Sequence, residues 1–153
     1  RRLDLYWLSY HRELARVIAE THDGFGAVLL FDAHSIGSVL PRFFEGRLPD
    51  FNLGTADGAS ADADLTDRMF GVLDNADGYT AILNGRFKGG YITRHYADPA
   101  NNIHAIQLEM GQVAYMDEDP PFRFRPDRAD RVRPVLTELL ETGLDWITSR
   151  AAG

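Results

Sequence analysis

The sequence predicts an α/β fold, in which helices pack on a layered β-sheet. Apolar side chains make up 44% of the 153 residues and charged side chains 25%, the balance of a globular domain with a real core. Short apolar runs alternate with segments of helical periodicity, which is typical of alternating strands and helices. We therefore expect residues 1–153 to form a single α/β domain.

The first half of the chain predicts one helix, one strand and a long loop. Apolar side chains recur at helical spacing over residues 3–21, and Gly24 and Gly26 follow as helix breakers. The continuous apolar run at 27–31 predicts a strand buried on both faces, as in a parallel sheet, that ends at Asp32. Residues 36–61 are rich in glycine and proline, and we expect a functional loop there.

The second half adds two helices and two strands, over 65–73, 79–83, 103–108 and 132–147. Asp62 or Asp64 is expected to cap the first of these helices. Pro134 is expected near the first turn of the last helix, where proline is tolerated. Three strands make a small sheet for this class, and the chain opens with Arg1-Arg2 instead of methionine. We therefore expect an N-terminally incomplete copy of a larger fold.

Composition argues against several classes of function. The net charge of −7 disfavours general binding to nucleic acid or to anionic membranes. The absence of cysteine excludes disulfides and thiolate metal sites. No apolar run approaches the roughly 20 residues that span a bilayer, and no signal peptide opens the chain. We expect a cytoplasmic protein that acts on a small molecule.

Polar residues follow each predicted strand. Asp32 and His34 follow the first strand, Asn84 and Arg86 the second, and Glu109 the third. Ligands of open α/β sheets bind beyond the carboxyl ends of the strands. If the strands run parallel, these five side chains converge on one rim of the sheet.

His34 and Glu109 carry the clearest chemistry. A neutral imidazole at a strand end is a common zinc ligand, and the nearby Asp32 could orient its ring. The alternative is that Asp32 and Ser35 cap a turn and His34 is only half-buried. A carboxylate at Glu109 could take a proton from water in apolar surroundings. The alternative is an ordinary glutamate that faces solvent or pairs with an arginine.

A cluster of basic residues suggests an anionic ligand. No acidic residue occurs from Thr80 to Tyr96, and Arg42 lies in a second acid-free stretch. Guanidinium groups and close-approaching glycine backbone suit a small molecule with two carboxylates. A solvated basic surface is the alternative. The basic side chains of the first stretch are Arg86, Lys88, Arg94 and His95.

Several segments follow one another in an order that resembles the N-formylglutamate deformylase (N-formylglutamate amidohydrolase) family. The resemblance covers nearly the whole chain, and the long block from Asn84 to Tyr96 is its most specific part. The segments are Tyr10-His11, Asp32 to Ser35, Pro41 to Gly46, Leu48 to Thr55, Asn84 to Tyr96, Gln107 to Met110 and Tyr115 to Glu118.

This resemblance implies a phosphorylase/hydrolase-like three-layer α/β/α sandwich related to the zinc carboxypeptidases. It implies one Zn²⁺ and the hydrolysis of N-formyl-L-glutamate in histidine degradation. Carried over to this chain, His34 would be a zinc ligand, Asp32 its supporting carboxylate, and Glu109 the general base and proton donor. The expected binders of the substrate carboxylates are Arg42, Asn52, Asn84, Arg86 and Arg94, with His95 nearby.

The chain departs from the family in one respect. Family members carry a further histidine and an acidic ligand in an N-terminal part, and nothing before His34 matches them, so the remaining ligands are expected upstream of this chain. Two other functions stay open on the sequence alone. One is an amidohydrolase for another N-acyl amino acid or a peptide, and the other is a non-catalytic carboxylate-binding fragment.

Overall fold

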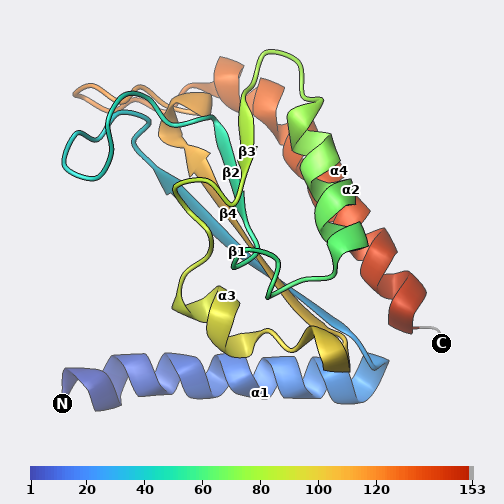
Figure 1. Ribbon diagram of the computed structural model, residues 1–153. Helices are drawn as coiled ribbons and strands as arrows, with labels where there is room; N and C mark the ends of the chain where they lie inside the picture. Colours follow the sequence, from blue (N-terminus) through green and yellow to red (C-terminus); the bar gives the residue numbers. More distant parts are fainter. Residues whose placement is uncertain (152–153) are drawn as a thin grey trace.

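The computed structural model describes residues 1–151, and its strands form one four-stranded sheet in the order β1-β4-β2-β3 (Figure 1). The parallel pairs are β1 with β4 and β2 with β3, whereas β2 runs antiparallel to β4. The sheet is therefore mixed, and the expectation of parallel strands holds only within each pair. The strands are β1 (Val28–Ile36), β2 (Phe51–Gly54), β3 (Ala81–Leu83) and β4 (Ile103–Gly111).

Strand lengths differ from the prediction. β1 does not end at Asp32 but continues to Ile36, and β4 continues past Glu109 to Gly111. The prediction places the end of each of these two strands at a polar residue. Both strands continue because polar side chains can alternate with apolar ones, so that one face is polar and the other apolar. β2 was missed, because its four residues are too short to show a pattern. All four are buried, so this strand is central despite its place in the predicted loop.

Three helices were predicted and a short fourth one was not. The predicted first helix is confirmed by a π-helical turn at Leu3–Trp7 that leads into α1. Gly24 does not break it, because α1 continues to Phe25 and only Gly26, with a φ of 73°, ends it. Asp62 caps α2, because its Oδ1 accepts a hydrogen bond from the backbone N of Asp64 at 2.9 Å. The α-helices are α1 (Leu8–Phe25), α2 (Ala63–Asp74), α3 (Tyr91–Tyr96) and α4 (Pro126–Ala151).

The expected place of Pro134 near the start of the last helix is wrong. α4 begins at Pro126, six residues before the apolar periodicity starts, so Pro134 lies inside the helix. A proline at this position removes one backbone hydrogen bond. The helix continues because its apolar side chains, Val132, Leu139, Trp146 and Ile147 among them, remain packed in the core.

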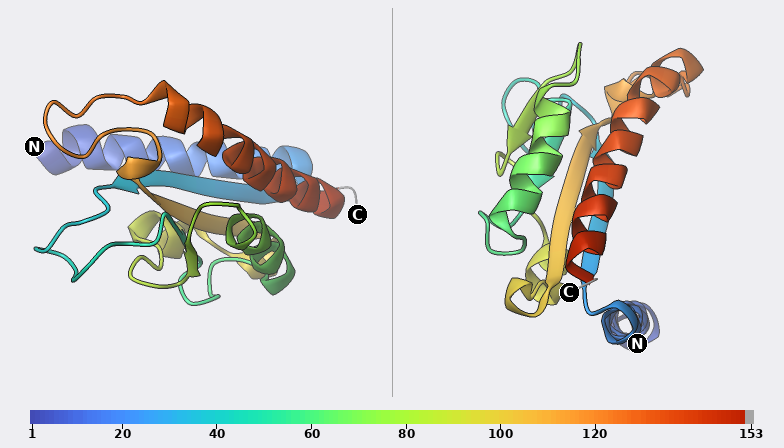
Figure 2. Two further views of the ribbon diagram at one scale, coloured as in Figure 1. Left: turned by 90° about the horizontal axis from the view of Figure 1, so that it is seen from above. Right: turned by 90° about the vertical axis from the view of Figure 1, so that its right-hand side faces the viewer.

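The hydrophobic core lies between the sheet and the pair α2 and α4. These two helices lie side by side over one face of the sheet (Figure 2). Gly143 lets α4 approach closely, since a Cβ atom there would lie 2.8 Å from Leu29 Cδ2 and 3.2 Å from Met69 Sδ. The fully buried apolar side chains of this core include Phe51, Leu53, Leu65, Met69, Leu73, Ile106 and Leu139.

α1 and α3 lie at the lower end of the sheet in Figure 1, away from α2. A groove of about 570 Å³ runs between α1, β1 and α4, and its lining includes Leu14, Ile18, Leu30 and Leu144. Within residues 1–151, the outer edge of β1 has no partner strand. The structure is thus a mixed α/β fold with helices packed on its sheet, while the three-layer sandwich and the incomplete N-terminus stay predictions.

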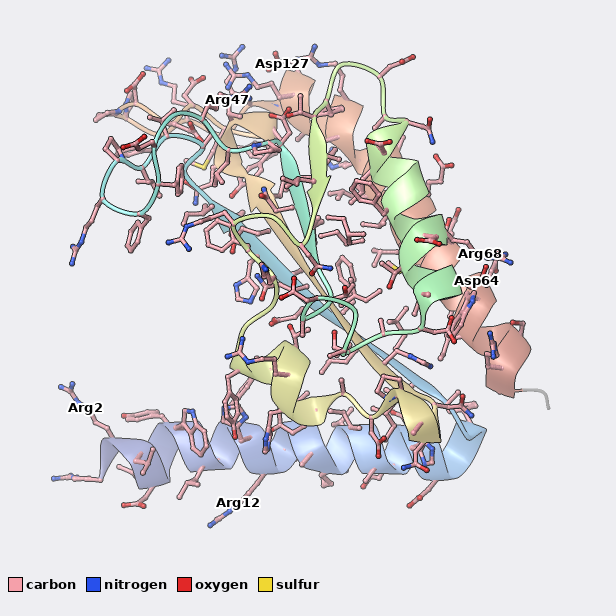
Figure 3. All side chains as sticks on the ribbon, viewed as in Figure 1. Arg2, Arg12, Arg47, Asp64, Arg68 and Asp127 are labelled. Atoms are coloured by element: carbon pink, nitrogen blue, oxygen red, sulfur yellow. The ribbon has the colours of Figure 1, made fainter. Side chains whose placement is uncertain are left out.

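Charged side chains cover the outer surfaces of the helices. Arg12 extends from α1 away from the sheet, Arg2 lies at the N-terminal end of the helical segment, and Asp64 and Arg68 lie together on α2 (Figure 3). The latter two form an ion pair of 3.0 Å on the exposed surface, where such pairs contribute little to stability. None of the helices within residues 1–151 combines the length and the hydropathy that a membrane span requires.

Candidate functional site

Four of the predicted site residues lie on one face of the sheet, together with a fifth polar residue that was not predicted. Successive side chains of a strand point to opposite faces, so every second residue of β1, β4 and β2 lies away from the core. The strand register then places five polar residues on the same face. They are Asp32, His34, Asn52, Gln107 and Glu109.

His34, Glu109 and Asn52 form a row across three neighbouring strands. Glu109 pairs with His34 of β1 on one side and with Asn52 of β2 on the other. Side chains in such register have Cβ atoms about 5 Å apart. Only 7% of Glu109 is exposed, so neither alternative that placed it in solvent or beside an arginine is correct within the described part of the chain.

Burial raises the pKa of the Glu109 carboxyl group above its usual value. His34 opposes this shift, and the negative charge of Asp32 adds to it. A carboxyl group in such surroundings binds and releases a proton more readily near neutral pH than an exposed glutamate does. That property suits a general acid and base.

Asp32 holds the imidazole of His34. Its Oδ1 lies 2.9 Å from His34 Nε2, and the two residues are two positions apart on one strand, so they share a face. The alternative in which Asp32 and Ser35 cap a turn is wrong, because both lie within β1. Ser35 points to the opposite face, where its Oγ lies 2.8 Å from Tyr115 Oη. It is therefore not a partner of His34.

Asn52 is almost fully buried, with 1% of its surface exposed. Its Nδ2 donates one hydrogen bond to the backbone O of Pro49 at 2.9 Å and another to that of Glu109 at 3.3 Å. Both amide hydrogens are thus used by the backbone. Its Oδ1 has no partner among the described residues.

A backbone segment crosses the polar face next to this row. A Cβ atom on Gly54 would lie only 2.6 Å from Gly89 N, so only glycine permits the crossing of Lys88 and Gly89 over β2. Gly90 N donates to Gln107 Oε1 at 2.8 Å, and α3 begins at the next residue. Gln107 was not predicted as a site residue, although it alternates with Glu109 along one strand and so lies on the same face.

The loop between β1 and β2 is held by hydrogen bonds near its start and at its middle. Glu118 accepts hydrogen bonds from Ser38 N and Ser38 Oγ, both at 2.6 Å. Further along the loop, Arg86 Nη2 donates to Phe43 O at 3.0 Å. This contact uses part of the Arg86 guanidinium for the loop itself. Arg42, which neighbours Phe43, makes no ion pair with any carboxylate of residues 1–151.

The remaining predicted binders make contacts of their own. Thr55 N donates to Asn84 Oδ1 at 2.8 Å, and Asn84 Nδ2 donates to Thr55 Oγ1 at 2.8 Å. Arg94 donates to Gly89 O at 2.7 Å, and His95 stacks on Tyr91 with ring centroids 4.6 Å apart.

β3 runs opposite to β1 and β4, so the end of β3 does not meet theirs at one rim. The site is formed on a face of the sheet instead. The substrate-binding roles of the arginines, asparagines and His95 stay predictions.

The residues at hand do not complete a zinc site. Within residues 1–151, no group of three or more histidine, aspartate or glutamate side chains lies close enough together to hold a metal ion. A catalytic zinc usually takes about three protein ligands. His34 with Asp32 would supply part of such a set.

Comparisons with known proteins agree on one family. A family model described as N-formylglutamate amidohydrolase matches residues 1–116. The N-formylglutamate deformylase of Pseudomonas aeruginosa is 53% identical over 146 residues, which cover 95% of this chain and 55% of that protein. The N-formylglutamate deformylase of Pseudomonas putida is 51% identical over 150 residues, which cover 98% of this chain and 56% of that protein.

A solved structure has the same fold. The crystal structure of N-formylglutamate amidohydrolase from Ralstonia eutropha JMP134 superimposes with a TM-score of 0.81 at 26% identity. The superposition covers 96% of this chain and 54% of that one. The chain thus spans about half the length of the relatives that it matches.

Proposed function

Because the chain belongs to the N-formylglutamate amidohydrolase family, we propose that the protein hydrolyses N-formyl-L-glutamate to formate and L-glutamate. Two relatives that are 53% and 51% identical to this chain over the matched 146 and 150 residues are named N-formylglutamate deformylases. The observation that supports the proposal most strongly is the buried Glu109 in register with His34. An isolated fold resemblance would not require these two side chains to be neighbours.

Glu109 would transfer the proton that the reaction needs. Hydrolysis adds water to the formyl carbon and breaks the C–N bond, so one proton must pass from the water to the departing nitrogen. A buried carboxylate beside the reacting carbon can accept this proton and then donate it. The raised pKa makes the Glu109 carboxylate a stronger base, and its protonated form exists at higher pH than that of an exposed glutamate. Asp32 would keep the His34 ring oriented toward the same site.

Guanidinium groups near the site would select a substrate with two carboxylates. Arg42 would be free to bind a carboxylate without breaking a hydrogen bond to the described residues, whereas Arg86 and Arg94 already donate to backbone carbonyls. A neutral substrate would leave these charges without partners. This reasoning favours N-formyl-L-glutamate over neutral N-formyl amino acids.

The activity is also proposed to depend on zinc, with His34 as one ligand. Further ligands would have to come from outside residues 1–151, since these residues do not complete the set. When bound, zinc would polarise the formyl oxygen and lower the pKa of a bound water. A role in histidine degradation and a cytoplasmic location remain expectations attached to this proposal.

Formate release from N-formyl-L-glutamate tests the proposal directly. The protein is treated with a chelator and assayed with and without added zinc, next to N-formyl-L-glutamine and N-acetyl-L-glutamate. We expect zinc-restored formate release from N-formyl-L-glutamate and at least about tenfold lower kcat/KM for N-formyl-L-glutamine, which lacks one carboxylate. A faster reaction with N-acetyl-L-glutamate would assign a different deacylase. A folded protein that binds but cleaves none of the three would be a carboxylate-binding module.

A further inference from the structure

One polar atom of the site lacks a partner. Among the described residues, three buried side-chain atoms have no hydrogen bond, namely Asn52 Oδ1, Thr93 Oγ1 and His104 Nε2. His104 lies on the core side of the sheet against the Trp146 ring, and Thr93 lies on α3. Asn52 alone lies in the row with Glu109 and His34. Asn52 Oδ1 is therefore the unpaired atom that belongs to the candidate site.

The orientation of the Asn52 amide is fixed by its surroundings. Nδ2 faces two carbonyl oxygens, those of Pro49 and Glu109. A flipped amide would place oxygen against oxygen at both contacts, which is unfavourable. The free atom is thus an acceptor, and a buried acceptor without a donor is costly and uncommon in native proteins.

This geometry is incompatible with the role that the resemblance suggested for Asn52. A carboxylate offers only acceptor oxygens, and both Asn52 hydrogens are already used by the backbone. At neutral pH, N-formyl-L-glutamate carries two carboxylates, a formyl oxygen and a single donor, which is its amide N–H. Only that N–H complements a free acceptor in this place.

We infer that Asn52 Oδ1 accepts a hydrogen bond from the amide N–H of the bound N-acyl amino acid and so holds the scissile nitrogen beside Glu109. The inference rests on the proposed function. It explains why asparagine occupies the position next to Glu109, which must protonate that same nitrogen when the C–N bond breaks. Asn52 is therefore a substrate-positioning residue, and the other predicted residues, Arg42, Asn84, Arg86 and Arg94 with His95 nearby, remain to bind the carboxylates.

An ester analogue isolates this hydrogen bond. The formate ester of 2-hydroxyglutarate has oxygen in place of the amide nitrogen and lacks the N–H. For Asn52→Leu, we expect kcat/KM on the amide to fall about 10- to 100-fold more than kcat/KM on the ester, after correction for spontaneous ester hydrolysis. Structural damage would reduce both rates alike, so the ratio of the two rates is the decisive quantity.

Two further variants act as controls. Asn52→Asp keeps an acceptor oxygen but loses the donor to the Glu109 backbone, so we expect both rates to fall while their ratio stays near that of the wild type. Asn84→Gly removes another asparagine, whose amide oxygen and nitrogen both bond to Thr55, at a φ of 50° that glycine tolerates. Its amide-to-ester ratio should also remain unchanged.

Equilibrium binding of the same two compounds separates this inference from the proposed function. If the wild type cleaves neither compound, the proposed function fails, and dissociation constants then decide the role of Asn52. Weaker binding of the amide by Asn52→Leu, with unchanged binding of the ester, supports the inference. An equal loss of both compounds, in rate or in affinity, overturns it.

Discussion

The two faces of the central sheet differ although the same strands form them. On one face, Leu53, Ile106 and Leu108 are buried under α2 and α4. On the other face, Asn52, Gln107 and Glu109 carry the polar groups. The alternation of side chains along β2 and β4 therefore builds the core and the candidate site at once. A substitution should affect stability or activity according to its face, even between neighbours in the sequence.

The largest expected difference comes from the same change made on both faces. Ile106→Asp places a carboxylate in the core without a partner, and we expect a loss of about 4 kcal/mol or more in the free energy of unfolding. Ile82→Asp is the matched control, because Ile82 pairs with Asn52 and is 36% exposed. It should cost about 1 kcal/mol or less. Urea unfolding measures both, and similar losses would contradict the division into two faces.

The ionisation of Glu109 is expected to have a smaller effect on the free energy of unfolding. Burial raises its folded-state pKa, so the folded protein retains this proton at pH values where the unfolded chain has lost it. Stability therefore falls as pH rises from the usual glutamate pKa through the folded one. Relative to Glu109→Gln, which has no such proton, the wild type should lose stability over this range. The unfolding free energies of the wild type and of Glu109→Gln are measured at several pH values with a chelator present. If Glu109 were well solvated, the difference between the two free energies would not depend on pH.

The smallest predicted effect lies away from both faces, at the start of α2. Asp62→Ala removes the acceptor for Asp64 N, and we expect a loss of about 1 kcal/mol in unfolding free energy with no change in kcat/KM. Asp62→Asn retains the cap and should restore most of the stability. Thermal unfolding of the two variants tests this. Equal destabilisation by both would show that the side-chain cap is unimportant.

Sequence patterns located the helices and the chemical groups better than they located the strands. The periodicity that predicted α1, α2 and α4 extends over many residues, and Asp62 was visible as a cap. β2 has only four residues, Phe51–Gly54, and gave no such signal. Its position in the sheet depends on pairing with β4, which lies more than fifty residues later in the sequence. Local patterns do not contain that information.

The site was predicted in part, for a similar reason. His34, Asp32 and Glu109 were selected correctly as neighbours, since β1 and β4 do run parallel. Their arrangement at a rim was wrong, because the antiparallel β2 places the site on a face. The unpaired oxygen of Asn52 depends on where the backbone of Pro49 and Glu109 lies. No sequence pattern could have revealed it.

The pair Leu108 and Glu109 tests the separation of core and site most directly. Unfolding free energy and formate release from N-formyl-L-glutamate are measured for Leu108→Ala and Glu109→Gln under the conditions that support wild-type activity. We expect Leu108→Ala to lose about 2–5 kcal/mol of stability and to retain activity while folded. Glu109→Gln should keep its stability and lose at least about a hundredfold in kcat. Near-normal turnover by Glu109→Gln would remove Glu109 from the mechanism and contradict the assignment of the polar face as the site.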